Sequence, residues 1–185
     1  MVKKSLLLFF ALFTFATANA QTEDEVYNQY LDFNLARLQG ETEKAMTLGQ
    51  DILPNVAKLK PKAQTSFYYS IGNLFENDSQ SVKAIEYYEK VAAAVPDYYV
   101  AQRALGYLYA KQADEMIDKF TPPYIAVAKK ALPRLEKAQA CDPDDDTLKL
   151  IKKLYTSIGD TQSIATLPAR LRVLSKTCID LLDDK

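Results

Sequence analysis

Histidine and tryptophan are both absent from this chain of 185 residues, which also has only five glycines and two cysteines. Without histidine it lacks the commonest general base and the commonest metal ligand, and with them the usual catalytic triads. Five glycines are too few for many tight β-turns or for a glycine-rich phosphate loop. The 23 basic side chains are balanced by 24 acidic ones, whereas nucleic-acid-binding domains usually carry a basic excess. We therefore expect no catalysis, no cofactor, no bound metal and no nucleic-acid partner.

The first twenty residues have the three-part pattern of a secretory signal peptide. Lys3 and Lys4 precede an apolar run at residues 6–15, and residues 18–20 form an A-x-A cleavage site. The alternative is a retained N-terminal anchor, but the run is about half of the roughly 20 residues that span a bilayer. No later segment is long and apolar enough to cross a membrane. The sequence predicts a signal peptide at 1–20 and a domain at 21–185 that is exported, either periplasmic or secreted.

Apolar residues in the rest of the chain recur at the spacing of a helix. Tyr68, Ile71, Gly72 and Phe75 follow the i, i+3, i+4, i+7 pattern. Sustained two-residue alternation is absent, and so are the Asn-Gly and Asp-Gly pairs that mark hairpins. The sequence therefore predicts an all-α fold built from short antiparallel helix pairs.

The helical pattern repeats along the chain. From Tyr68 to Pro96 the sequence is Y-x2-I-G-x2-F-x8-A-x3-Y-x2-V-x4-P, and Gly106 lies 34 residues after Gly72. The segment 131–143 restates 84–96 thirteen residues late, because an insertion at 112–123 separates the two halves of that unit. A fixed period of this length indicates stacked structural repeats.

The pattern resembles that of the tetratricopeptide repeat (TPR) family. The resemblance implies a right-handed α-α superhelix, a solenoid of about four helix pairs, with repeats at approximately 26–59, 65–98, 99–144 and 145–182. In such a unit small residues let the paired helices approach, large residues fill the space between them, and prolines end the unit. The residues that match these packing roles are Gly72, Ala84, Tyr88, Pro96, Gly106, Ala131, Leu135 and Pro143.

The two terminal units depart from the pattern. In the first, Phe33 occupies the place of the small residue and Gly49 the place of a large one. In the last, Lys152 replaces the small residue and Pro168 the packing aromatic. We expect a new helix to start at Pro168 and to carry its apolar stripe through residues 171–182. Atypical terminal units are expected, since each end must cap the stack.

The resemblance also implies a concave face lined by the first helix of each pair, through residues one helical turn away from the packing stripe. Such a face could bind an extended peptide or the acidic tail of a partner; the alternative is a solvated face on a scaffold whose contacts lie elsewhere. Some family members clamp a C-terminal carboxylate with a Lys and an Asn, but here the lysine is missing, and we do not predict that ligand. The residues predicted for the face are Tyr30, Asn34, Tyr69, Asn73, Arg103, Tyr107, Lys149 and Lys153.

The insertion carries Met116, Ile117 and Phe120 at helical spacing. We expect the preceding helix to extend through it until Pro122 and Pro123 stop that helix and start the next. The segment could be a partner-specific projection with an apolar tip, or it could fold back and cover a neighbouring helix.

An acidic run at residues 142–146 invites comparison with a calcium loop. Counted from Asp142, however, the sixth and twelfth places of an EF-hand hold Thr147 and Lys153 instead of Gly and Glu. We expect these carboxylates to cap a helix at 146–157 instead.

Cys141 and Cys178 are the only thiols. In an oxidising compartment they could form a disulfide, because both lie near the ends of neighbouring second helices. Both also lie on packing stripes, where cysteine acts as a small apolar filler. The sequence does not decide between a disulfide and two cysteines that act as apolar filler.

Together these features predict a non-catalytic protein–protein interaction module or adaptor of the cell envelope, with a protein or peptide as its partner. A second hypothesis is a structural subunit of a larger envelope assembly, held through its terminal helix or the insertion at 112–123. A third is an enzyme or a glycan-binding accessory protein that uses the tyrosines of the groove.

Overall fold

The computed structural model describes residues 21–182, so the predicted signal peptide lies outside the described residues. Within that range the chain forms eight α-helices and one 3-10 helix and contains no β-strand, which confirms the all-α prediction. The helices are α1 (Glu23–Leu38), α2 (Thr42–Ile52), η1 (Leu53–Lys58), α3 (Pro61–Asn77), α4 (Ser81–Ala94), α5 (Tyr99–Asp114), α6 (Pro122–Cys141), α7 (Asp145–Ser157) and α8 (Thr161–Leu174).

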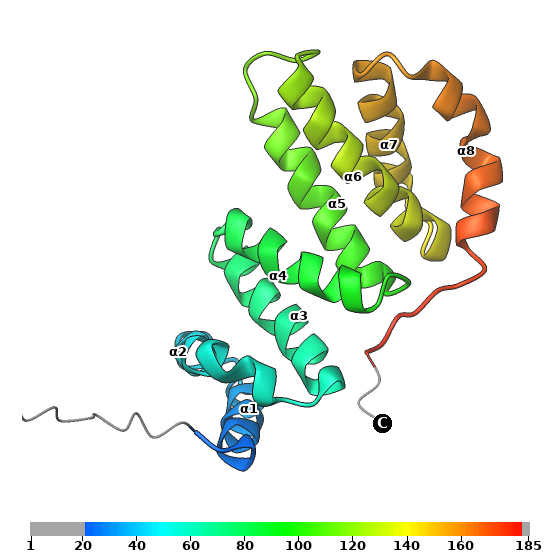
Figure 1. Ribbon diagram of the computed structural model, residues 1–185. Coiled ribbons are helices and arrows are strands. Elements are labelled where there is room, and N and C mark those ends of the chain that lie inside the picture. Colours follow the sequence, from blue (N-terminus) through cyan, green and yellow to red (C-terminus); the bar gives the residue numbers. More distant parts are fainter. Residues whose placement is uncertain (1–20, 183–185) are drawn as a thin grey trace, which may run out of the picture.

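Most helices pack against their neighbours in the chain. The contacts are densest within the pairs α1–α2, α3–α4 and α5–α6, and the pairs follow one another from α1 to α8 (Figure 1). A single cluster of buried side chains runs through all four pairs, from Val26 in α1 to Leu167 in α8. Among the described residues, no helix has the length and apolar character needed to cross a membrane.

Short turns join the helices within the first, second and fourth pairs, and two of these turns depend on glycine. Gly40 and Gly159 each have a φ of 74°, in the left-handed region that residues with a Cβ atom rarely adopt. The helix predicted at 146–157 begins one residue earlier, because the carboxylate of Asp144 accepts a hydrogen bond from the Thr147 backbone at 2.7 Å. Asp144 thereby satisfies one of the free N–H groups at the start of α7.

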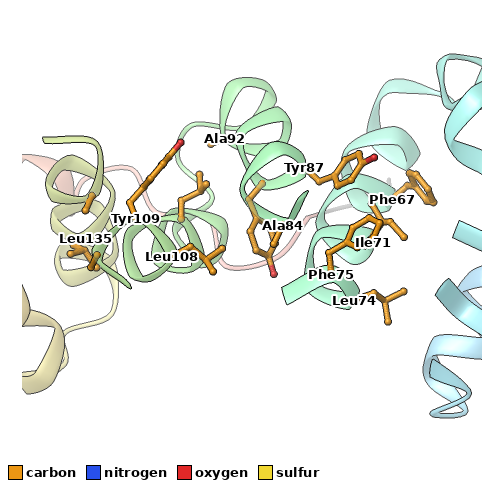
Figure 2. Close-up of a cluster of buried hydrophobic side chains, with 14 of the residues drawn as sticks. Phe67, Ile71, Leu74, Phe75, Ala84, Tyr87, Ala92, Leu108, Tyr109 and Leu135 are labelled. Carbon is orange, nitrogen blue, oxygen red and sulfur yellow. The ribbon is translucent and has the colours of Figure 1, made fainter. Parts of the chain in front are cut away.

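The predicted packing residues lie between the paired helices. A Cβ atom on Gly72 would lie 3.1 Å from the Tyr88 ring, and one on Gly106 would lie 2.6 Å from Leu135 Cδ2. Each glycine therefore makes room for the large residue that the repeat pattern assigns to the facing helix. Figure 2 shows Leu135 and Ala84 within this core. Of the remaining predicted positions, Ala84 and Ala131 are fully buried, and Pro96 and Pro143 lie two residues after the ends of α4 and α6.

The first pair uses the same contact with its sides exchanged. Phe33 in α1 is fully buried, and a Cβ atom on Gly49 in α2 would lie 3.0 Å from the Phe33 ring and 2.5 Å from Ile71 Cδ1. The large residue is here on the first helix and the small one on the second. The missing side chain of Gly49 thus leaves the room that the Phe33 and Ile71 side chains fill.

The predicted extension of the helix through the insertion is wrong. α5 ends at Asp114, and residues 115–121 form a loop before Pro122 starts α6. Ile117 is 97% exposed and Phe120 is 68% exposed. A further helical turn would gain little, because no helix between residues 21 and 182 covers these side chains and most helical stability comes from such packing.

The prediction for the last helix is also wrong. α8 runs without a break from Thr161 to Leu174 through Pro168, whose side chain is exposed. Its inner face is held by buried Leu167, and α8 packs more against α6 than against its partner α7. The helix stops at Leu174, so the apolar positions expected at residues 178 and 181 belong to an extended segment. We call residues 175–182 the C-terminal tail.

The packing at Gly106 makes a prediction about stability. In an exposed helix, Gly→Ala stabilises by about 1 kcal/mol; here we expect Gly106→Ala to lower the free energy of unfolding by about 1–3 kcal/mol, because the new methyl group overlaps Leu135. In a Leu135→Ala background the same change should cost less, because only the contact with the backbone nitrogen of residue 135, 3.1 Å from the new methyl group, remains. Urea denaturation of the four proteins measures the coupling. Equal effects of Gly106→Ala in both backgrounds would rule out this contact as the cause.

Candidate functional site

Tyr30 is the one predicted face residue that the structure removes from the surface. It is only 6% exposed, and its ring lies edge-on to Phe67 at a centroid distance of 6.5 Å. The one-turn offset used to assign it fails because Phe33 fills the middle of the first pair and α3 covers Tyr30. Asn34, one turn further, is partly exposed and accepts a hydrogen bond from Arg37 at 2.9 Å.

Tyr69 and Asn73 lie one turn apart on α3, as predicted, and both are partly exposed. The Tyr69 ring contacts the ring of Tyr98, the residue just before α5, with centroids 5.3 Å apart. Asn73 Oδ1 accepts a hydrogen bond from Asn77 at 3.2 Å. These contacts hold the side chains in place and connect α3 to the start of α5.

Arg103 and Tyr107 connect α5 to the following pair. Arg103 donates to the carboxylate of Asp142 at 2.7 Å and to the Asp142 backbone carbonyl at 2.8 Å. The Tyr107 hydroxyl lies 2.7 Å from Thr147 Oγ1 on α7, and the Tyr107 side chain is 38% exposed. Side chains of α5 thus reach both the α6–α7 connection and the first turn of α7.

The basic end of the predicted face lies on α7. Lys153 donates to both carboxylate oxygens of Asp114 at 2.9 Å, and Lys149 pairs with Asp146 at 2.9 Å. Both ammonium groups remain well exposed, and exposed ion pairs of this kind contribute only about 0–1 kcal/mol. Either lysine can therefore exchange its present partner for another carboxylate at small cost.

The C-terminal tail runs from the end of α8 back towards the turn between α4 and α5 (Figure 1). Cys141 and Cys178 form a disulfide with their Cα atoms 5.6 Å apart, which decides between the two readings of these residues. Ile179 accepts a backbone hydrogen bond from Tyr99 at 3.1 Å and donates one to Asp97 at 2.9 Å. In the chain-entropy account, a disulfide closing a loop of this length stabilises by about 3–4 kcal/mol.

The ammonium group of Lys137 joins α6 to the tail. Its side chain is 7% exposed. It donates to the carboxylate of Asp97 at 2.6 Å, to the Leu174 carbonyl at 3.1 Å, and to both the carbonyl and the hydroxyl of Thr177. A buried ammonium group without such partners would cost several kcal/mol. The bonds from Lys137 lower the pKa of Asp97 below its usual range, and the Thr177 hydroxyl, 2.8 Å from the same carboxylate, adds to the shift.

A second buried charge on α6 holds α7 and α8. Glu136 is 4% exposed; it accepts from Arg170 of α8 at 2.6 and 2.9 Å and from the Tyr155 hydroxyl of α7. Burial and the neighbouring carboxylate raise the pKa of Tyr155 to about 12. The hydrogen bond to Glu136 likewise raises the pKa of Arg170. This network replaces the small-against-large contact that Lys152 and Pro168 remove from the last pair.

A hollow of roughly 880 Å³ lies between α4, α5, α6, the end of α8 and the tail, a size that would suit a small molecule. Its most buried cations already have partners, because Arg134 donates to Glu89 at 2.7 Å and to Gln102 at 2.8 Å, and Lys137 donates to Asp97. We therefore interpret the hollow as a junction between elements and assign no ligand to it.

Sequence reasoning missed the buried charges of α6 and an exposed apolar stripe on α1. Glu136 and Lys137 follow Leu135 directly and look like ordinary solvent-facing residues, so the sequence carried no signal for their burial. The stripe did leave a signal, since its large apolar residues are spaced by four, four and three positions. Its members are Tyr27, Leu31, Leu35 and Leu38.

The lowered pKa of Asp97 predicts a pH dependence. Because its folded pKa lies below the ordinary value near 4, the carboxylate stabilises the docked tail at higher pH, and this contribution disappears as the pH falls through the folded pKa. At about pH 7 we expect Asp97→Asn to reduce the free energy of unfolding by about 1–3 kcal/mol. The difference between the two proteins should shrink as the pH falls below the ordinary carboxyl pKa and through the lowered folded pKa of Asp97. Urea denaturation across this range is the measurement, and a difference independent of pH would contradict the assignment.

The sequence matches no protein-family model, and it matches no curated protein. The resemblance to TPR proteins therefore rests on the 34-residue spacing within this chain. Any functional conclusion has to come from the geometry of the described residues.

Proposed function

We propose that this protein is a non-catalytic interaction module of the cell envelope, built as a TPR-like right-handed solenoid. It binds a protein or peptide through the concave face formed by the first helices of its pairs. The proposal includes export of the chain after removal of the predicted signal peptide.

One observation carries the proposal: side chains predicted for the concave face connect the first helix of one pair to the first helix of the next. Tyr69 on α3 touches Tyr98 at the start of α5, while Tyr107 on α5 reaches Thr147 on α7. Lys153 on α7 in turn reaches back to α5. These side chains sit on rigid helices and are already ordered, so a ligand would meet a preformed surface and lose little free energy in ordering it.

The charges on the face indicate what kind of segment it would bind. Lys149 and Lys153 are exposed and hold only exposed carboxylates. Tyr107 offers an exposed aromatic ring one helix away. An extended peptide with acidic residues could exchange its carboxylates for the present ones and pack a side chain against the ring. We therefore propose an acidic peptide or tail as the ligand.

The loop at residues 115–121 supports the second candidate, a subunit of a larger envelope assembly. Met116 packs against the core, whereas Ile117 and Phe120 are exposed at its tip. Exposed apolar groups of this kind often mark contact surfaces. The terminal helix that this hypothesis first invoked supports it less, because α8 stops at Leu174.

Site-specific photo-crosslinking in the native envelope distinguishes these candidates. A benzophenone side chain would replace Tyr107 on the face, Ile117 on the loop, or Val82, which is 81% exposed on α4 and serves as the control. We expect a discrete product from position 107 and none from position 82. Reversing Lys149 and Lys153 to Glu should lower the yield at position 107 about tenfold, because two exposed charge contacts become repulsive.

The crosslinking result at position 117 tests the second candidate, the assembly subunit. A product from position 117 alone would reject the concave face and favour the assembly subunit. A product at position 107 that the charge reversal leaves unchanged would reject the acidic ligand while keeping the face.

A further inference from the structure

Helix α1 has two apolar sides. The side that faces the protein contributes fully buried residues, including Val26, Phe33 and Ala36. The other side carries four large apolar side chains that are between 47% and 86% exposed, which we call the outer stripe: Tyr27, Leu31, Leu35 and Leu38. At 3.6 residues per turn these positions fall on one face over three turns, about 16 Å along the axis.

The outer stripe differs from ordinary surface apolar residues. A single exposed residue such as Val82 is normal and needs no explanation. A terminal unit of a repeat stack, however, is expected to cap the stack with a polar outer face. Here the terminal helix instead repeats the i, i+4, i+8 spacing with which helices pack against other helices. The stripe is thus a packing face that lacks a helix among the described residues.

The exposed charges that α1 itself carries have one sign, while Lys58 of η1 lies at its N-terminal end and donates to the Gln21 carbonyl. Between residues 21 and 36 the chain has four carboxylates and no Lys or Arg. Arg37, the one basic residue of the helix, is turned inwards: it donates to Asn34, and its guanidinium lies 5.5 Å from the Phe33 ring centroid. Burial lowers the pKa of Arg37. Asp24 and Asp32, in contrast, are exposed.

We propose that the outer stripe binds an amphipathic helix of a partner protein whose apolar side is flanked by Lys and Arg. The stripe supplies apolar anchors at the spacing of helix-on-helix packing, and the surrounding carboxylates attract a basic flank and reject an acidic one. A second copy of this chain fits less well, because pairing two such helices would bring their carboxylates together. The proposal does not depend on the concave face, since no residue of the stripe belongs to that face.

Binding of two matched peptides to the purified protein tests the proposal. One is a labelled helical peptide of about five turns with Leu along one side and Lys beside it, and the other has Glu in place of each Lys. By fluorescence anisotropy we expect the Lys peptide to bind at least about tenfold more tightly than the Glu peptide, a preference that salt reduces. Replacing both Asp24 and Asp32 with Lys should remove the preference.

Apolar substitutions test the stripe itself. Leu31→Asn with Leu35→Asn should weaken binding of the Lys peptide about tenfold or more, whereas Val82→Asn on α4 should leave it unchanged. Circular dichroism checks that all variants stay folded, as expected for side chains that are about half exposed or more. Equal binding of the two peptides, or no effect of the Leu substitutions, would overturn the proposal.

Two further results would identify another occupant and also overturn the proposal. Analytical ultracentrifugation could reveal a dimer that the Leu31→Asn and Leu35→Asn changes dissociate, which would assign the stripe to a second copy. Mass spectrometry of the exported protein could find residues 1–20 retained, with peptide binding only after their removal, which would assign the stripe to that segment.

Discussion

The buried ammonium group of Lys137 is the constraint on which the C-terminal part of the structure depends. A charge with 7% of its side chain exposed must find its hydrogen-bond partners within the protein. They come from three places in the chain: the turn after α4 supplies Asp97, the end of α8 supplies the Leu174 carbonyl, and the tail supplies Thr177. The course of the tail follows from this requirement. Once Thr177 is bound to Lys137, Cys178 is brought to Cys141 at the end of α6, and Ile179 is placed to pair with the backbone of the turn after α4.

The N-terminal part depends on a different constraint, the close approach of paired helices. In the second and third pairs a glycine on the first helix faces Tyr88 or Leu135 on the second, and in the first pair Phe33 and Gly49 exchange these roles. In each of these pairs a large side chain on one helix fills the space beside a glycine on the other, and protein cores tolerate exchanges of this kind. The last pair has no such contact, and the ion pair between Glu136 and Arg170 joins α8 to α6 in its place. This explains why α8 leans towards α6 instead of its own partner.

These two constraints explain which parts of the fold the sequence could predict. The repeat period and the packing residues could be identified from the sequence because apolar spacing and glycine placement are local properties. Together they predicted the helix pairs and the contacts of Gly72 and Gly106. The end of α5 and the course of the tail could not be predicted, since they depend on which groups lie nearby in space. None of the described residues buries Ile117, and the tail bonds to Lys137. For the site, the offset from the packing stripe placed Tyr107, Lys149 and Lys153 on the surface. It failed at Tyr30 because the first pair is packed with its roles exchanged.

Amide hydrogen exchange at Tyr99 and Ile179 tests most directly whether Lys137 holds the tail. These two amides make the backbone bonds between the tail and the turn after α4, so their protection reports docking. In a variant with both cysteines replaced by Ser, the account predicts that both amides remain protected. Adding Lys137→Met, which keeps the volume and removes the charge, should abolish their protection while the amides of α3 and α4 stay protected. Protection that survives the loss of the ammonium group, or that disappears with the disulfide alone, would contradict the account.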